Sequence, residues 1–311
     1  METLKLKNSD LEVSRLCMGG CPMGRYGWGT VLKKELIDAV HLALDSGINF
    51  FDTADTYGLG ESEKTLGEAL GKKRKQAIVA TKFGVRVENG ITSYDNSKNW
   101  VNKAVNNSLK RLNTDYIDLY QIHYRDSNTS IEEVINTLEE IKKQGKIRYY
   151  GICNVHYKDI NELNKYKGKF VSFQNEYSLA CRKNENDMFE FSQNLEMSPL
   201  TWGSLGQGIL TGKYDKNCTF DSDDRRNKEI YVNFHGKKLL KNLKIVDVLK
   251  EISKEVKRPI SSIAIRFILD YIPKSVVLAG IKNTDQLKGN CEAFGWKLNE
   301  KQIQWLQKVS E

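Results

Sequence analysis

Two fold classes are separated by Gly19-Gly20-Cys21-Pro22-Met23-Gly24, the stretch in which the first apolar segment of strand length ends. An open, doubly wound sheet with a nucleotide site would carry a Gly-x-Gly-x-x-Gly turn after an early strand. Here the glycine spacing is different, and Pro22 has no N–H group to offer a phosphate. This stretch therefore argues against the open sheet.

Eight apolar segments of strand length recur along the chain, with helical patterns between them. Most are apolar throughout, which is typical of strands buried on both faces of a parallel sheet. The segments are Leu16–Gly20, Asn49–Asp52, Ala77–Thr81, Ile117–Ile122, Ile147–Ile152, Phe170–Phe173, Met197–Thr201 and Val276–Ala279. Apolar residues at helical spacing predict helices over 36–44, 101–112, 131–141, 241–256 and 261–271.

The chain of 311 residues shows no linker, internal repeat or shift in composition at which it could be divided. We therefore expect a single domain over residues 1–311. Eight buried parallel strands that alternate with helices favour a closed (β/α)8 TIM barrel over the open sheet.

The composition excludes several functional classes. Basic residues exceed acidic ones by 48 to 40, but they are spread along the chain, which argues against a nucleic-acid site. A hydrophobic content of 40% excludes global disorder, and no apolar run of membrane-spanning length is present. The start of the chain is charged where a secretory signal is apolar, and the six cysteines form no Cys-x-x-Cys pair. We expect a cytoplasmic protein with no metal site and no nucleic-acid or membrane partner.

Polar side chains follow several of the predicted strands, at the end where a barrel assembles its chemistry. Asp52 and Tyr57 follow the second strand, Lys82 the third and His123 the fourth. The later strands are followed by Cys153, Asn154, Gln174, Asn175 and Trp202. Each residue alone has an ordinary structural explanation, but one barrel would gather all of them around a single opening.

A phenol beside an ammonium group has a chemical use. A tyrosine titrates near pH ~10, and a neighbouring lysine favours the phenolate, so we expect Lys82 to lower the pKa of Tyr57 toward ~7. Asp52 would hold the lysine in place. A phenol tuned in this way exchanges a proton with an oxygen that changes between carbonyl and alcohol.

At these residues the chain resembles the aldo-keto reductases, from about Leu4 to Leu306. The strongest match is Phe51-Asp52-Thr53-Ala54-Asp55-Thr56-Tyr57-Gly58. Further matches are Gly60-Glu61-Ser62-Glu63, Leu66-Gly67-Glu68-Ala69-Leu70, Leu109-Lys110-Arg111-Leu112, Asp115-Tyr116-Ile117-Asp118-Leu119, Gly145-Lys146-Ile147-Arg148 and Leu210-Thr211-Gly212-Lys213-Tyr214. The chain looks most like the bacterial inositol-utilisation type and the potassium-channel β-subunit branch.

The resemblance implies a barrel that binds NADP(H), with NADH as the alternative cofactor, and reduces a small-molecule aldehyde or ketone by direct hydride transfer. Tyr57 would be the general acid, with Lys82, Asp52 and His123 as its partners. The implied cofactor residues are Asn154 and Gln174 at the nicotinamide carboxamide, Trp202 on its ring, Leu205, Gly206 and Lys213 at the pyrophosphate, and Gly280, Lys282, Gln286 and Asn290 at the adenosine phosphate.

Three positions depart from the family pattern. Cys153 stands where a serine usually precedes the asparagine, and Gly289 replaces a frequent acidic residue. Gln286 stands where the aldose-reductase branch has an arginine over the 2′-phosphate, although Lys282 offers a nearby cation. We expect a preference for NADPH over NADH, but arginine is the better bidentate phosphate partner, so the strength of that preference stays open.

Two loops and one long connection are expected to surround the substrate and cofactor. The loop residues are Arg25, Tyr26 and Trp28 after the first strand, and Arg86, Asn89 and Tyr94 after the third. The connection from Gly203 to Gly236 is long enough to fold over a cofactor, and Asp221, Asp223, Asp224, Arg225 and Arg226 are candidates for a latch.

Two other functions stay open at this point. One is an NADP(H)-binding redox-sensing or regulatory subunit with little turnover. The other is a Schiff-base aldolase that uses Lys82 as the nucleophile, which an adjacent carboxylate disfavours because it keeps the amine protonated. The sequence does not determine the substrate, the direction of reaction or the oligomeric state.

Overall fold

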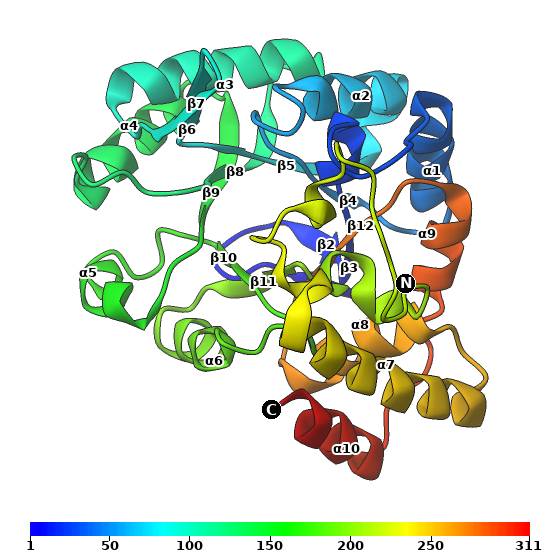
Figure 1. Ribbon diagram of the computed structural model, residues 1–311. Helices are drawn as coiled ribbons and strands as arrows, with labels where there is room; N and C mark the ends of the chain where they lie inside the picture. Colours follow the sequence, from blue (N-terminus) through cyan, green and yellow to red (C-terminus); the bar gives the residue numbers. More distant parts are fainter.

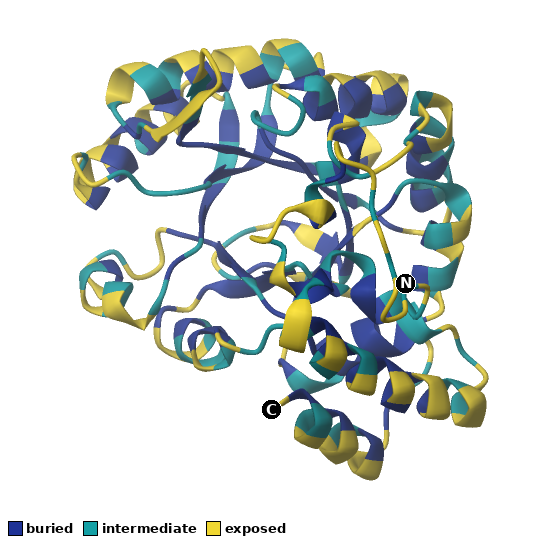
Figure 2. Ribbon diagram, in the orientation of Figure 1, coloured by how far each residue is buried: buried dark blue, intermediate teal, exposed yellow.

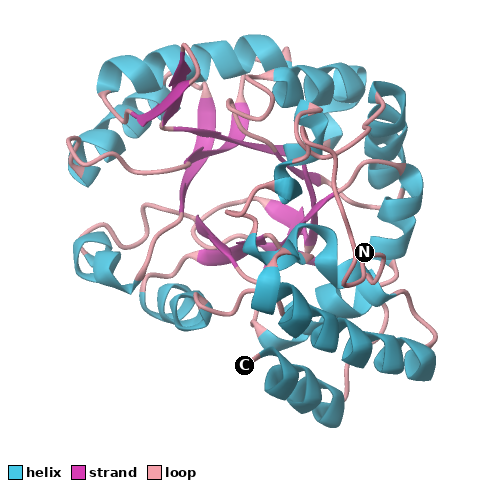
Figure 3. Cartoon of the chain, in the orientation of Figure 1, coloured by secondary structure: helices cyan, strands magenta, loops and turns pink.

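Eight parallel strands close into a barrel in the computed structural model, which describes all residues from Met1 to Glu311 (Figures 1 and 3). They are β3 (Leu16–Gly19), β4 (Phe50–Asp52), β5 (Ile78–Phe83), β8 (Ile117–Ile122), β9 (Ile147–Cys153), β10 (Ser172–Glu176), β11 (Ser198–Trp202) and β12 (Val276–Gly280). Each strand pairs with the next one along the chain, and β12 pairs with β3 to close the ring. The predicted (β/α)8 barrel is confirmed.

Helices surround the barrel, each with one face turned toward the interior of the molecule, and α10 packs on α7 and α8 instead of on the strands (Figure 2). They are α1 (Lys33–Asp45), α2 (Glu61–Leu70), α3 (Lys98–Leu112), α4 (Ile131–Lys143), α5 (Ile160–Asn164), α6 (Glu185–Asn194), α7 (Gly236–Val256), α8 (Ile260–Tyr271), α9 (Thr284–Cys291) and α10 (Glu300–Ser310). Their apolar spacing explains the buried face, and local signals set their ends. Ser130 and Glu133 form a capping box at the start of α4, and Pro259 precedes α8.

The inside of the barrel is filled in layers. Because side chains alternate along a strand, every second residue points inward. Phe50, Ala80 and Leu119 belong to one apolar layer, beneath which the hairpin of β1 (Thr3–Lys5) and β2 (Glu12–Ser14) adds Leu6 and Val13. Two residues further along the same strands, the next layer is polar and forms the floor of the site.

Two features differ from the expected elements. The loop after β5 is a hairpin of β6 (Val85–Glu88) and β7 (Ile91–Tyr94), because Asn89 and Gly90 both adopt a positive φ, which suits a two-residue hairpin turn. Strand β10 begins at Ser172 and runs to Glu176, later than the predicted 170–173. None of the helices combines the length and the apolar character that crossing a membrane requires.

Candidate active site

A cavity of about 1850 Å³ opens where the barrel strands end. Its lining includes most of the predicted site residues: Asp52, Tyr57, His123, Asn154, Gln174, Trp202, Leu205, Lys213, Gly280, Lys282, Gln286 and Asn290. Lys82 and Gly206 do not line the cavity, and both are buried behind its wall. The structure therefore brings the predicted residues together around one space.

Lys82 and Asp52 form a buried ion pair in the floor of the cavity. The Lys82 Nζ donates to Asp52 Oδ1 at 2.5 Å and to the carbonyl oxygen of Thr53 at 2.9 Å. Burial alone would lower the pKa of Lys82, but the charges of Asp52 and Tyr57 raise it above its usual value. The amine is therefore held in its protonated form.

A chain of amides fixes the other oxygen of Asp52. Its Oδ2 accepts hydrogen bonds from Gln121 Nε2 at 3.0 Å and from Gln174 Nε2 at 2.9 Å. Gln174 Nε2 also donates to Gln121 Oε1 at 3.2 Å. These contacts use both N–H groups of Gln174, while its Oε1 has no partner in the protein. All three side chains are buried, so the carboxylate is held in one orientation.

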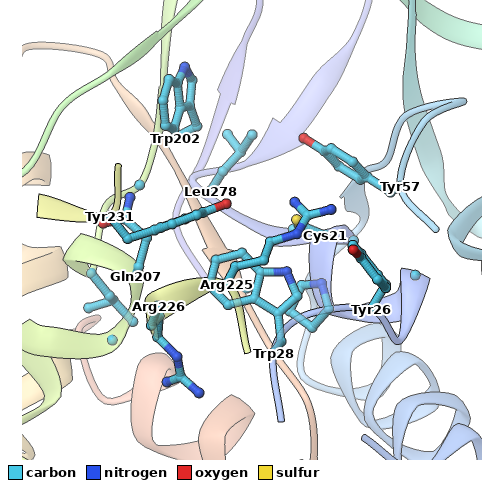
Figure 4. A pocket seen from close by; sticks show the side chains of 18 of the residues that line it. Cys21, Tyr26, Trp28, Tyr57, Trp202, Gln207, Arg225, Arg226, Tyr231 and Leu278 are labelled. Atoms are coloured by element: carbon cyan, nitrogen blue, oxygen red, sulfur yellow. The ribbon is translucent and has the colours of Figure 1, made fainter. Parts of the chain in front are cut away.

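Tyr57 lies against this ion pair with its hydroxyl turned toward the cavity (Figure 4). Lys82 Nζ donates to the Tyr57 hydroxyl at 3.4 Å. Burial raises the pKa of Tyr57 above its ordinary value, and the charge of Lys82 opposes this rise. Lys82 acts to lower this pKa, as expected, but burial disfavours the phenolate more than the cation favours it, so the net shift is upward and not toward ~7. Tyr57 is therefore a protonated phenol at neutral pH, as a proton donor must be.

The backbone around Tyr57 is set by a close approach of two loops. Gly58 adopts φ +60, and a Cβ added there would lie 2.2 Å from the carbonyl oxygen of Gly24. Gly24 ends the short 3₁₀ helix η1 (Cys21–Gly24) that follows β3. Only glycine permits both this conformation and this contact, so the loop after β3 positions Tyr57.

His123 follows β8 and faces Tyr57. The two ring centroids are 5.9 Å apart in an edge-on arrangement. Burial and the charge of Lys82 both lower the pKa of His123 well below its usual value, so the ring is neutral. Its buried Nδ1 has no hydrogen-bond partner.

Asn154 connects His123 to Trp202 on the opposite wall of the cavity. Asn154 Nδ2 donates to the carbonyl oxygen of His123 at 3.0 Å, and its Oδ1 accepts from Trp202 Nε1 at 3.1 Å. The residue adopts φ +55, which asparagine tolerates better than most residues. These bonds fix the orientation of the indole ring beside the cavity.

Residues 203–235, which we call the strap, connect β11 to α7 and pass in front of the barrel strands in Figure 1. The strap reaches the loop after β3, where the N–H of Arg225 donates to the carbonyl oxygen of Gly27 at 3.0 Å. Asp224 and Arg226 form a buried ion pair at 2.5 Å, whereas Asp221 and Asp223 are exposed. Both members of this ion pair lie within the strap, so it does not fasten the strap to another element. Of the expected latch residues, Arg225 has the side chain that reaches the loop after β3, where its guanidinium lies over the ring of Tyr26.

Lys213, Arg226 and Lys282 form a group of cations on the cavity wall, away from the Lys82–Asp52 ion pair. The pKa of Lys282 is lowered by burial and by the charges of Arg226 and Lys213, while Asp224 opposes the shift. Lys282 Nζ donates to the carbonyl oxygen of Trp28, and its N–H donates to Gln286 Oε1 at 3.0 Å. Three cations therefore face one another with a single carboxylate among them, which is an arrangement suited to a multiply charged anion.

Only some residues of the two predicted substrate loops line the cavity. Tyr26 and Trp28 line the cavity, as do Arg25 and Tyr94. Arg86 does not, because it pairs with Glu88 and Asp95 on the outside of the hairpin, and Asn89 occupies the hairpin turn. The hairpin instead contributes Val85, Val87, Gly90 and Thr92 to the cavity lining.

The comparison with known proteins agrees with this architecture. A model described as the Aldo/keto reductase family matches residues 15–311. The chain belongs to the aldo/keto reductase family. Membership implies an enzyme that carries out NAD(P)H-dependent carbonyl reduction.

Individual relatives cover nearly the whole chain. It is 33% identical over 304 residues to aldo-keto reductase YhdN of Bacillus subtilis, an alignment that spans 96% of this chain and 90% of that protein. It is 28% identical over 327 residues to the NADH-specific methylglyoxal reductase of Escherichia coli, an alignment that spans 100% of this chain and 99% of that protein. The structure of the glycerol dehydrogenase AKR11B4 from Gluconobacter oxydans superposes with a TM-score of 0.89 at 29% identity, covering 99% of this chain and 94% of that one.

In this aldo/keto reductase, sequence reasoning missed Gln121 as a site residue. Gln121 lies inside an apolar strand, Ile117–Ile122, whereas the predicted site residues were those at or after the strand ends. A signal was present, because Leu119 and Gln121 are two residues apart and therefore point to the same side of the strand. Because Leu119 points into the barrel, Gln121 also points inward and lies in the next layer toward the carboxyl end of the strand, which is the polar layer.

Proposed function

We propose that this protein reduces an aldehyde or ketone to the alcohol with NADP(H), with Tyr57 as the general acid. The observation that carries this proposal is the contact between the neutral Tyr57 hydroxyl and the Lys82–Asp52 ion pair in the cavity floor. When bound, the nicotinamide would supply the hydride that adds to the carbonyl carbon. The protein supplies the positions of the reactants and the proton.

The chain's own residues account for the proton transfer. Tyr57 donates its proton to the carbonyl oxygen as negative charge develops there. The phenolate that forms is stabilised by the Lys82 ammonium, which Asp52 keeps oriented and protonated. His123 is neutral, so it can donate one N–H to the same oxygen without adding a charge.

The residues of the cavity fit a dinucleotide. The volume of about 1850 Å³ exceeds the roughly 300–1,000 Å³ of an ordinary small-molecule site, so a dinucleotide and a substrate have room together. We propose that Gln174 Oε1 and Asn154 hold the nicotinamide carboxamide and that Trp202 lies against the ring. Lys213, Lys282 and the neighbouring backbone of Leu205, Gly206 and Gly280 would hold the phosphates, with Gln286 and Asn290 at the adenosine.

The two alternative functions are less well supported. The raised pKa of Lys82 and its ion pair keep the amine protonated, which opposes Schiff-base formation. A redox-sensing subunit needs only the cofactor site, whereas this cavity also retains the whole set of Asp52, Tyr57, Lys82 and His123. A proton donor with a buried ammonium beside it is what the turnover of a carbonyl substrate requires.

A turnover assay tests the proposal directly. We expect aldehyde-dependent oxidation of NADPH by the purified protein, followed by the absorbance of the reduced nicotinamide across aldehydes, ketones and sugars. Steady-state turnover with at least one carbonyl class would support the reductase. Tight NADPH binding without turnover on any of them would favour the sensing subunit instead.

Cofactor preference should depend on Lys282. We expect Lys282→Gln to weaken NADPH binding roughly 10- to 100-fold and NADH binding much less, because one charge-assisted contact to the 2′-phosphate is lost. The measurement is quenching of protein fluorescence by each cofactor. Lys288→Gln is the control, since Lys288 is exposed on α9 outside the cavity. An equal loss for both cofactors would place Lys282 on a phosphate that they share.

A further inference from the structure

Arg225 and Arg226 are neighbours on the strap, but their side chains point in opposite directions (Figure 4). Arg226 is buried in its ion pair with Asp224. Arg225 has no carboxylate within 4 Å, and its guanidinium lies over the ring of Tyr26 at 5.1 Å from the centroid. Figure 4 shows this guanidinium extending toward Tyr57 and the interior of the cavity.

Arg225 is the one cation of the cavity without an assigned partner. Six lysine and arginine side chains line the cavity. Three of them are paired with carboxylates: Arg25 with Glu61, Lys183 with Glu176 and Arg226 with Asp224. Lys213 and Lys282 belong to the end that we assign to the cofactor phosphates. Arg225 contacts the aromatic side chains of Tyr26 and Tyr231, but it is the remaining cation of the cavity that has neither a carboxylate partner nor a proposed cofactor phosphate.

The loop after β3 places this charge on the side of the cavity where Tyr57 lies. One end of the loop, at Gly24, packs against the backbone of Tyr57 and Gly58. At Gly27, where φ is +72, an added Cβ would lie 2.3 Å from Arg225 Cγ. Glycine at that position thus lets the arginine side chain cross the loop closely, so the same short segment positions both Tyr57 and Arg225.

The groups around the guanidinium show which side chains feel its charge. The charge of Arg225 opposes the rise in pKa that burial causes at both Cys21 and Tyr231. Cys21 is also close enough to Tyr57 to affect the pKa of that phenol. The ring of Tyr231 lies edge-on to Trp28, with centroids 6.0 Å apart. Arg225 is thus surrounded by the aromatic side chains of Tyr26, Trp28 and Tyr231, and its guanidinium presents a planar set of donors.

We infer that Arg225 binds an anionic group, a carboxylate or a phosphate, carried by the carbonyl substrate, so that the enzyme prefers acidic aldehydes or ketones to neutral ones. This inference rests on the proposed reductase function. The guanidinium forms charge-assisted, often bidentate hydrogen bonds with either anion, which fixes the orientation of the substrate as well as its affinity. Tyr26 and Trp28 would enclose the apolar part of the same molecule.

A matched pair of substrates tests the inference. We expect kcat/KM to be higher for 4-carboxybenzaldehyde than for methyl 4-formylbenzoate, which has the same shape without the charge. In Arg225→Gln the acid-to-ester ratio should fall about 10- to 100-fold, because a charge-assisted contact is removed. Arg225→Lys should keep part of the preference. Glyceraldehyde 3-phosphate against glyceraldehyde repeats the comparison for phosphate and shows which anion is favoured.

The control is Lys228→Gln, which removes the same charge from an exposed position of the same strap. Its acid-to-ester ratio should match that of the wild type. An unchanged ratio in Arg225→Gln would overturn the inference, and a parallel loss of NADPH affinity would assign Arg225 to the cofactor. Calorimetric binding of 4-(hydroxymethyl)benzoate to the NADPH complex gives a second readout: if no carbonyl is reduced but this acid binds only when Arg225 is present, the reductase proposal fails and the anion site stands.

Discussion

Tyr57→Phe should reduce kcat/KM for carbonyl reduction by about 10²- to 10⁴-fold, the usual contribution of a positioned general acid. The substitution removes one oxygen atom and leaves the ring that contacts His123 and covers Lys82. NADPH binding should be unchanged, because the hydroxyl bonds only to Lys82 within the protein. Initial rates with the best aldehyde from the substrate panel, together with fluorescence titration of NADPH, separate the two effects.

The control for this change is Tyr157→Phe. Tyr157 is 64% exposed and lies outside the cavity, so the same loss of a hydroxyl should leave the rate at the wild-type value. Turnover near the wild-type rate in Tyr57→Phe would refute the proposed mechanism. A loss of NADPH affinity that matched the loss of rate would show that the tyrosine serves binding and not proton transfer.

Lys82→Met should affect activity and stability together. Activity should fall at least as far as in Tyr57→Phe, because the phenolate would form without a neighbouring cation and beside an unpaired carboxylate. Breaking a buried ion pair from one side costs about 3–5 kcal/mol, since the remaining charge stays in a medium that solvates it poorly. Both Lys82 and Asp52 are nearly inaccessible to solvent, so this cost applies here. Denaturant unfolding of the protein without cofactor measures it.

A double substitution separates charge from packing. Asp52→Asn combined with Lys82→Met removes both charges and leaves the amide contacts to Gln121 and Gln174 sterically possible. The double variant should be more stable than Lys82→Met alone, yet equally inactive. If Lys82→Met unfolds at the same denaturant concentration as the wild type, the unpaired carboxylate of Asp52 does not lower the free energy of unfolding. The ion pair would then have a role other than stabilising the fold.

Much of the site was predictable because chemistry-bearing residues follow the strand ends in order. Asp52, Tyr57 and His123 were predicted before their contacts were seen, and they line one cavity. Gln121 was missed because it is inside a strand. The direction of the Tyr57 pKa was predicted wrongly, because a sequence shows which charges are present but not how deeply a phenol is buried.

The role of the strap was only partly predictable. Its length indicated a cover, and its charges indicated a latch. The path of the Arg225 side chain depends on Gly27, which lies on a loop about two hundred residues away in sequence. No periodicity connects two such segments, so the pairing of Arg226 and the isolation of Arg225 emerge only when the barrel is closed.

The order of apolar segments and helical patterns was enough to predict a closed parallel barrel, because strands that are apolar on both faces need a packed interior on one side and helices on the other. The residue types at the strand ends likewise predicted proton transfer at a carbonyl, with a Schiff-base aldolase and a redox-sensing subunit left as alternatives. Tertiary structure alone decided which inward-facing side chains meet, how far each charge is removed from water, and which cation is left without a partner. Those outcomes depend on distances of a few ångströms between segments that are remote in the chain, and pair energies at such distances are set by geometry and desolvation.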